Sequence, residues 1–445
     1  MTPTNKQLVP IGPFPAGIDN RSEETDLATD KDGNVIAARA LVNVDIDDKG
    51  KASTRKGRTK VYDGTNCHSG FYCKQFPWAL FVEDNTLKAI RPDWNPVTIR
   101  AGLTPQATVS YAEINGEIYW SNDYENGRIS RDLEDLPFGL EGPSGPPLVA
   151  VVTDQGGLAA GRYQVSATWQ TTDSLGNPFE ESGAPGATVI TVPAGGGIAC
   201  SAIPQPTDAR ATLVNLYVSE PDGDELRRGY TLPVGITEFT IGQGRRLNTL
   251  NTMLASPMPP GQIVRGYNGR SVVACEKYLR HSVPLHFGLT RLRMDFEQEP
   301  ARITMAEPVG AADIAGIFVS SANRIWFLAG NFSPERAHIP RRRVHDFGAV
   351  FGTSCVAPGK WFDPTLTGDV IFFVDTAGTA LIGLPDGSVR VVTRDYAAPE
   401  ADFGSVMLRE INGTRRILAN MHGTKNKARS GDFVTARVVR NGLSQ

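Results

Sequence analysis

"VSYAEINGEIYWSND", residues 109–123, places alternating apolar residues around the dipeptide Asn115-Gly116. An Asn-Gly pair between two such runs favours a type I′ turn, because both residues tolerate the positive φ angles that this tight turn requires. The pattern therefore predicts two antiparallel strands joined by a two-residue turn.

The same pattern recurs along the chain. A hairpin cannot bury its own apolar face, so a series of hairpins has to pack side by side or close into a ring. The spacing of about 30 to 55 residues per pair of hairpins is typical of the blades of a β-propeller. We therefore expect an all-β fold built on a six- or seven-bladed β-propeller. The other predicted turns are Asp84-Asn85, Asn268-Gly269, Asn323, Ala377-Gly378, Asp386-Gly387 and Asn412-Gly413.

The middle of the chain has a different pattern. "GRYQVSATWQTTD" alternates strictly and places Tyr163, Val165, Ala167 and Trp169 on one face of a strand. Further strand-like segments follow, and Pro/Gly-rich segments bracket the region. These features predict an immunoglobulin- or fibronectin-like β-sandwich inserted into the propeller. The expected parts are an extended N-terminal arm (1–35), a first propeller part (36–142), the sandwich (143–260) and a second propeller part (261–445).

Composition narrows the class of protein. The chain of 445 residues has 46 glycines and 31 prolines, and its net charge is −3, so no global positive field indicates a nucleic-acid binder. We find no apolar run long enough to span a membrane and expect no signal peptide at the N-terminus. The five cysteines are scattered, as is typical of a protein folded in a reducing cytosol. Helix is expected only as a turn or two in "FEQEPARITMAE" and at the start of "RRRVHDF".

Metal sites have weak support. "NVDIDDKGKASTRKGRTKVYDG", residues 43–64, begins like a calcium-binding loop. In that alignment, however, Lys49 and Lys56 occupy ligand positions and would repel the ion, so we interpret the stretch as a β-hairpin. Cys67, His68 and Cys73 lack the second pair of ligands that a structural zinc site needs. We expect no metal and no other cofactor.

Catalytic signatures are also absent from the sequence. The histidines lack metal-ligand spacing, and we find no nucleophile elbow, phosphate-binding loop or dinucleotide fingerprint. We therefore expect a protein that is not an enzyme. The six tryptophans recur about once per predicted unit, and we expect them to pack in cores.

Two basic clusters are the candidate functional residues. On strands, such charges form a solvated face or pair with neighbouring acids, or else contact phosphates or an acidic neighbouring subunit. We expect them mostly to serve subunit contacts. The candidates are Lys49, Lys51, Arg55, Lys56 and Arg58 in the opening hairpin, and Arg341, Arg342 and Arg343.

The order of these features resembles a known family. The opening hairpin fits the pattern N-v-x-x-x-x-G-x-x-x-x-R-x-G, with Asn43, Gly50, Arg55 and Gly57 at the defined positions. An inserted module follows, and then "NGRSVVACEKYLRHSVP" and "GIFVSSANRIWFLAGNFSPE". This order is similar to the β-propeller tail nozzle proteins of short-tailed bacteriophages, also called tail tube B or packaged-DNA-stabilising tail hub proteins. The chain departs from the family pattern at Arg280 and His281, which precede Ser282.

The resemblance implies a structural protein of the virion, assembled in the host cytoplasm. Family members form a six-fold ring below the portal and adaptor, continue the DNA channel, retain packaged DNA and open for ejection. The implied partners are further copies of the chain, portal-side adaptor proteins, tail fibres or spikes, and genomic double-stranded DNA in transient, non-specific contact. Two alternatives stay open: a propeller carbohydrate-active tail enzyme, which would need paired carboxylates, and a host-receptor-binding tail module.

Overall fold

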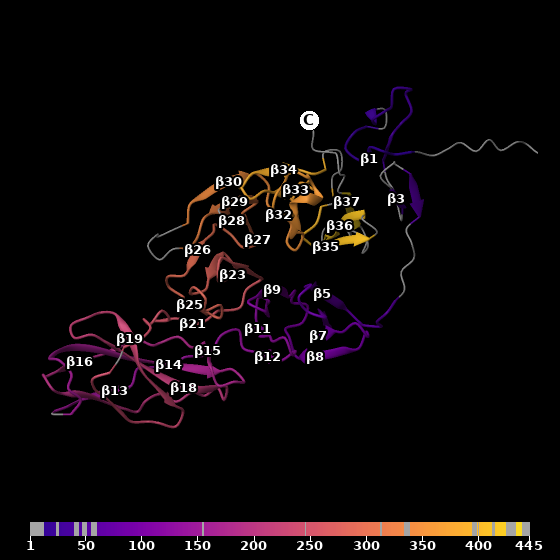
Figure 1. Ribbon diagram of the computed structural model, residues 1–445. Helices are drawn as coiled ribbons and strands as arrows, with labels where there is room; N and C mark the ends of the chain where they lie inside the picture. The colour runs from indigo at the N-terminus through magenta and orange to yellow at the C-terminus, as the bar shows by residue number, and fades with distance from the viewer. Residues whose placement is uncertain are drawn as a thin grey trace, which may run out of the picture. The chain divides into compact units, whose positions relative to one another are not determined.

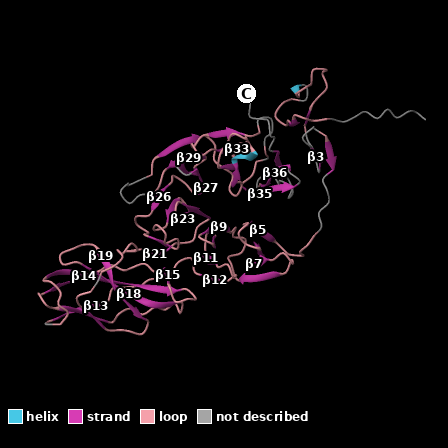
Figure 2. Cartoon of the chain, viewed as in Figure 1, coloured by secondary structure: helices cyan, strands magenta, loops and turns pink. Residues whose placement is uncertain are grey.

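The regular secondary structure of the described residues is almost entirely β-strand (Figures 1 and 2). The computed structural model describes residues 13–23, 26–39, 44–46, 51–54, 60–153, 155–244, 246–311, 314–332, 339–393, 398, 400–411, 414–423 and 433–437. Two compact units are present, one formed by Gly64–Arg302 and the other by Met1–Asp63 with Ile303–Gln445. None of the helices in these described segments is long and apolar enough to cross a membrane.

The first compact unit contains three four-stranded antiparallel sheets in which hydrogen-bonded neighbours follow chain order. Their strands are β5 (Cys67–Tyr72), β6 (Ala79–Glu83), β7 (Thr86–Ile90) and β8 (Pro96–Arg100); β9 (Ser110–Ile114), β10 (Glu117–Ser121), β11 (Asn126–Ile129) and β12 (Asp135–Leu136); and β22 (Ile263–Tyr267), β23 (Arg270–Cys275), β24 (Tyr278–His281) and β26 (Phe296–Gln298). One core cluster packs the first two sheets together, and another packs the second sheet against the third.

The predicted tight turns join these strands. Asn115 and Gly116 have φ angles of 54° and 82°, and Ile114 pairs with Glu117 directly across the turn. Asn268 and Gly269 have φ angles of 45° and 70° between β22 and β23. Positive φ at both central residues is the geometry of a type I′ turn, so both hairpin predictions are confirmed.

Between β12 and β22 lie two sheets that share one hydrophobic core. Tyr163, Val165, Ala167 and Trp169 point into this core, as their alternation predicts, and each is at most 5% exposed. The three-stranded sheet consists of β13 (Leu148–Val152), β17 (Gly197–Ser201) and β20 (Phe239–Ile241). The five-stranded sheet consists of β14 (Gly161–Thr172), β15 (Pro178–Glu181), β16 (Thr188–Val192), β18 (Ala211–Ser219) and β19 (Leu226–Pro233). We call residues 148–241 the inserted module.

The second compact unit contains three more antiparallel sheets in chain order. Their strands are β27 (Ile303–Ala311), β28 (Ile314–Ser321), β29 (Arg324–Ala329) and β30 (Arg341–His345); β31 (Cys355–Pro358), β32 (Asp369–Val374), β33 (Ala380–Gly383) and β34 (Val389–Val391); and β35 (Phe403–Ile411), β36 (Thr414–His422) and β37 (Phe433–Arg437). Neighbouring sheets share cores here too. The turn expected at Asn412-Gly413 lies outside the described residues, although Ile411 pairs with Thr414 across it.

Short elements complete the fold. The opening stretch is a hairpin of β3 (Val44–Ile46) and β4 (Ala52–Thr54), which confirms the preferred interpretation. In the predicted arm, β1 (Gly17–Ile18) pairs in parallel with β2 (Ala37–Ala38), while residues 1–12 lie outside the described part of the chain. The two-residue strand β21 (Ser256–Pro257) pairs with β25 (Leu289–Thr290). A 3₁₀ turn, η2 (Gly359–Trp361), follows β31.

Two sequence predictions are wrong. The segments expected to hold helical turns instead form β26, the start of β27 and β30, because pairing with neighbouring strands satisfies their backbone groups. Trp94 is 52% exposed, whereas tryptophans were expected in cores. It occupies the turn between β7 and β8.

Candidate functional site

The predicted basic residues Arg341, Arg342 and Arg343 lie on strand β30, and all three are exposed. Strand β30 is the last strand of its sheet, and Arg341, Arg342 and Arg343 pair with Leu328, Phe327 and Trp326 of β29. Because successive side chains of a strand point to opposite faces, Arg342 projects to one face and its two neighbours to the other. The three guanidinium groups therefore do not form one continuous patch.

Two of these arginines already contact acidic residues of their own unit. Arg342 Nη2 donates to the backbone oxygen of Asp386 at 3.0 Å, and Arg343 forms an ion pair with Asp346. Hydrogen bonds from Ser388 lower the pKa of Asp386, and the nearby Arg342 adds to this effect. The local charge is thus partly balanced, which weakens the attraction for an isolated phosphate.

The other predicted cluster is described only in part. Lys51 is exposed just before β4. Lys49, Arg55, Lys56 and Arg58 lie outside the described residues, so their role stays a prediction. Arg246 Nη1 donates to the backbone oxygen of Ser219 at 2.8 Å and lies 3.5 Å from Glu220 Oε2.

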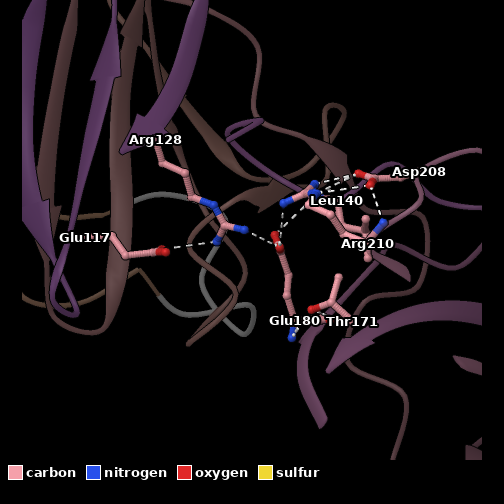
Figure 3. A network of polar contacts seen from close by, with 7 residues as sticks. All are labelled: Glu117, Arg128, Leu140, Thr171, Glu180, Asp208 and Arg210. Atoms are coloured by element: carbon pink, nitrogen blue, oxygen red, sulfur yellow. Dashed lines mark hydrogen bonds and ion pairs between the residues drawn. The ribbon is translucent and has the colours of Figure 1, made fainter. Parts of the chain in front are cut away.

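A buried ion network, which sequence reasoning missed, joins β11 to the inserted module (Figure 3). The side chain of Arg128 is only 5% exposed. Its Nη1 donates to Glu117 Oε2 at 3.2 Å, and its Nη2 donates to Glu180 Oε2. The backbone N–H of Leu140 donates to Glu180 Oε1 at 3.1 Å, so this carboxylate is held from two directions.

Further charges extend the network within the module. Arg210 Nη1 lies 4.0 Å from Glu180 Oε2 and its Nη2 donates to Asp208 Oδ2 at 2.6 Å. This bond lowers the pKa of Asp208. Burial raises the pKa of Glu117, while Arg128 opposes that shift. Buried charges need such partners, because an unpaired charge in a low-dielectric interior is strongly destabilising. The network can therefore fix the module on β9–β12.

Tightly packed backbone supports the same connection. An added Cβ at Gly139 would lie 2.2 Å from the oxygen of Gly288, and one at Gly142 would lie 2.3 Å from the oxygen of Gly183. Asn126 Nδ2 also donates to the oxygen of Met258 at 2.7 Å. Close backbone packing thus holds the first segment that connects the module to the neighbouring sheets, and a side-chain hydrogen bond holds the second.

A second buried polar cluster lies where the sequence departs from the family pattern. His281, on β24, accepts a hydrogen bond at its Nδ1 from Arg270 Nη1 at 3.3 Å. Arg291 Nε and Nη2 each donate to Asp295 at 3.0 Å. Burial lowers the pKa of His281 to about 4, although Asp295 opposes the shift, so the imidazole is neutral at neutral pH.

The cysteine and histidine residues considered for zinc do not form a metal site in the structure. Cys67 begins β5, and Cys73 directly follows this strand. His68 Nδ1 lies 2.8 Å from Ser69 Oγ. Across the described segments, no group of three or more His, Cys, Asp or Glu residues is placed to hold a metal ion. The expectation that the chain binds no cofactor stays a prediction.

Comparisons with known proteins add little. No protein-family model and no curated protein matches the sequence. Among solved structures, the Neurospora crassa Pan2 WD40 domain is 7% identical with a TM-score of 0.33, over 80% of this chain and 86% of that chain. The Dos1 propeller is 7% identical with a TM-score of 0.30, over 85% and 78%. Kluyveromyces lactis Hsv2p is 9% identical with a TM-score of 0.27, over 80% and 91%. These scores are too low to support an argument about fold or function.

Proposed function

We propose that the six sheets formed by β5–β12, β22–β24 with β26, and β27–β37 are consecutive blades of a β-propeller. In each of these sheets the strands pair in chain order, as in a propeller blade. We further propose that the inserted module is an immunoglobulin- or fibronectin-like sandwich, since its two sheets share one core. The insertion would then interrupt the propeller between its second and third blades.

On this basis we infer that the chain is a structural subunit of a phage tail nozzle. The observation that carries the proposal is the order of parts: the hairpin with the Asn43-to-Gly57 pattern, antiparallel meanders, an inserted two-sheet module, and further meanders. In this role, copies of the chain form a six-fold ring in the virion, below the portal and adaptor. The ring continues the DNA channel, retains the packaged genome and opens for ejection.

The distribution of charge suits this role. A channel wall that bound phosphates tightly would release counterions and hold the duplex instead of letting it slide. The net charge of −3 and the engagement of Arg342 and Arg343 with Asp386 and Asp346 favour a wall of low phosphate affinity. We therefore assign the basic strand mainly to subunit contacts. Portal-side adaptors and tail fibres or spikes are the expected neighbours.

The proposal is tested by the assembly state of the purified full-length chain. Electron micrographs and sedimentation velocity at increasing protein concentration should show a ring with a central lumen, and the ring should join tail-less particles. A chain that stays monomeric at all concentrations and on particles would contradict the nozzle function. Hydrolysis of host polysaccharide that depends on a single Asp or Glu would instead support the enzyme alternative.

A further inference from the structure

Trp94 is exposed to solvent and has a left-handed backbone conformation. The structure describes all six tryptophans. Only Trp94 is exposed, and the other five are buried or half-buried. Its φ angle of 64° lies in the left-handed region, which bulky residues rarely adopt and which Gly or Asn adopts more easily. Tryptophan at this position therefore combines an unfavourable backbone conformation with 52% exposure. A contact with a second molecule would explain the tryptophan at this position.

The turn that carries Trp94 is braced. The backbone N–H of Trp94 donates to the backbone oxygen of Arg91 at 2.9 Å. Asp93 accepts from the backbone N–H of Asn95 at 3.1 Å and from its side-chain amide at 2.8 Å. Pro92 and Pro96 restrict the backbone on both sides. A large aromatic side chain on a rigid turn loses little entropy on binding, which is characteristic of interface hot spots.

The same chain carries two exposed apolar residues on one strand of its other compact unit, with exposed Ser405 between them, and we call this segment the Phe403–Met407 strip. Phe403 and Met407 lie four residues apart on β35, hence on one face, and are 45% and 53% exposed. The ring of Phe403 stacks on the ring of His422, with 4.9 Å between their centroids. Asp402, next to Phe403, brings a carboxylate that is complementary in charge to Arg91.

We propose that the Trp94 turn of one copy docks on the Phe403–Met407 strip of a second copy. A contact between two different surfaces is heterologous, and repeated heterologous contacts are those that close rings, whereas a contact between two Trp94 turns would stop at a dimer. This inference rests on the proposed function, because it assigns the contact that builds the ring.

The test uses two variants of the full-length chain that each remove one side of the contact. Trp94→Asn removes the indole and suits the left-handed backbone, so its melting temperature should equal or exceed that of the wild type. Met407→Glu places a charge in the strip. Each variant alone should need at least a tenfold higher concentration than the wild type to assemble in sedimentation velocity. An equimolar mixture should yield dimers, since one intact turn meets one intact strip and no further contact can form.

Leu175→Ala is the matched control, because Leu175 is 84% exposed and also occupies a hairpin turn braced by an aspartate, Asp173. It should assemble like the wild type. If the wild type assembles and Trp94→Asn assembles equally well, or if the mixture remains monomeric, the docking inference is overturned while the ring proposal survives. If the wild type forms no oligomer, the ring proposal itself fails, and the docking inference fails with it.

Discussion

Arg128 and Glu180 form a buried ion pair between strand β11 and strand β15 of the inserted module. Their side chains are only 5% and 14% exposed. Removing Arg128 leaves Glu180 without its closest cationic partner in a buried site, and breaking a buried ion pair in this way typically costs about 3–5 kcal/mol. We therefore predict that Arg128→Met lowers the free energy of unfolding by about this amount, as measured by urea denaturation of the full-length chain.

The ion pair of Arg162 and Asp224 provides a matched control. The two groups are 3.8 Å apart, and their side chains are 55% and 88% exposed. Because exposed pairs contribute little, Arg162→Met should change the free energy of unfolding by less than about 1 kcal/mol. The double variant Arg128→Met/Glu180→Gln should recover part of the loss. Equal effects of the two arginine substitutions would contradict the role assigned to the buried network.

Stability should depend on pH through His281. Its pKa in the folded chain is about 4, below the ordinary value of 6.5, mainly because of burial. As pH falls below 6.5, the unfolded chain binds a proton that the folded chain does not, so stability is lost between about pH 6.5 and pH 4 at up to about 1.4 kcal/mol per pH unit. Burial lowers the pKa of His286 too, which adds to the loss in the same direction.

Urea unfolding measured at intervals from pH 7.5 to pH 4.5 tests this dependence. His281→Gln keeps a side-chain oxygen that can accept from Arg270 but does not titrate. We expect this variant to lose about 2 kcal/mol less than the wild type over the same range. Parallel curves for the two proteins would show that His281 takes up its proton equally in both states.

Gly127 should not tolerate a side chain. It pairs with Trp120 across β10 and β11, and an added Cβ would lie 2.8 Å from the indole Nε1 of Trp120. Because Trp120 is fully buried, the ring has little room to move. Gly127→Ala should therefore destabilise the chain by about 1–3 kcal/mol in thermal or urea unfolding.

Gly70, in strand β5, is the control for this substitution, since an added Cβ there has no neighbour within 4 Å. Gly70→Ala should leave stability unchanged or slightly raised, because alanine restricts the unfolded chain. A Gly127→Ala variant as stable as Gly70→Ala would mean that the Trp120 side chain repacks without cost.

Charge reversal of the basic strand separates its two candidate roles. If Arg341, Arg342 and Arg343 serve subunit contacts, the triple substitution to Glu should prevent ring formation, because like charges then meet at the interface. The assay is ring formation in electron micrographs, followed by genome retention in particles. Intact rings on particles that leak or misfire their genome would show that these arginines grip DNA instead.

The local elements follow from the sequence, because their causes are local. Asn115-Gly116 and Asn268-Gly269 specify tight turns through their own φ preferences. The alternation from Tyr163 to Trp169 specifies which face of β14 is buried, since a one-residue shift would expose all four side chains. These features require no knowledge of distant residues, and the structure confirms them.

Only the tertiary structure decides which distant groups meet. Arg128 and Glu180 are 52 residues apart, and nothing in the sequence near either of them indicates that they become a buried pair. Trp94 looked like a core residue, because tryptophan is usually buried, but the turn between β7 and β8 keeps it in solvent. Residues 296–307 contain good helix formers. The strands within this range are β26, which pairs with β24, and the start of β27, which pairs with β28. In each case the outcome depends on which surfaces the fold brings together, and that is a property of the packed chain, not of any short segment.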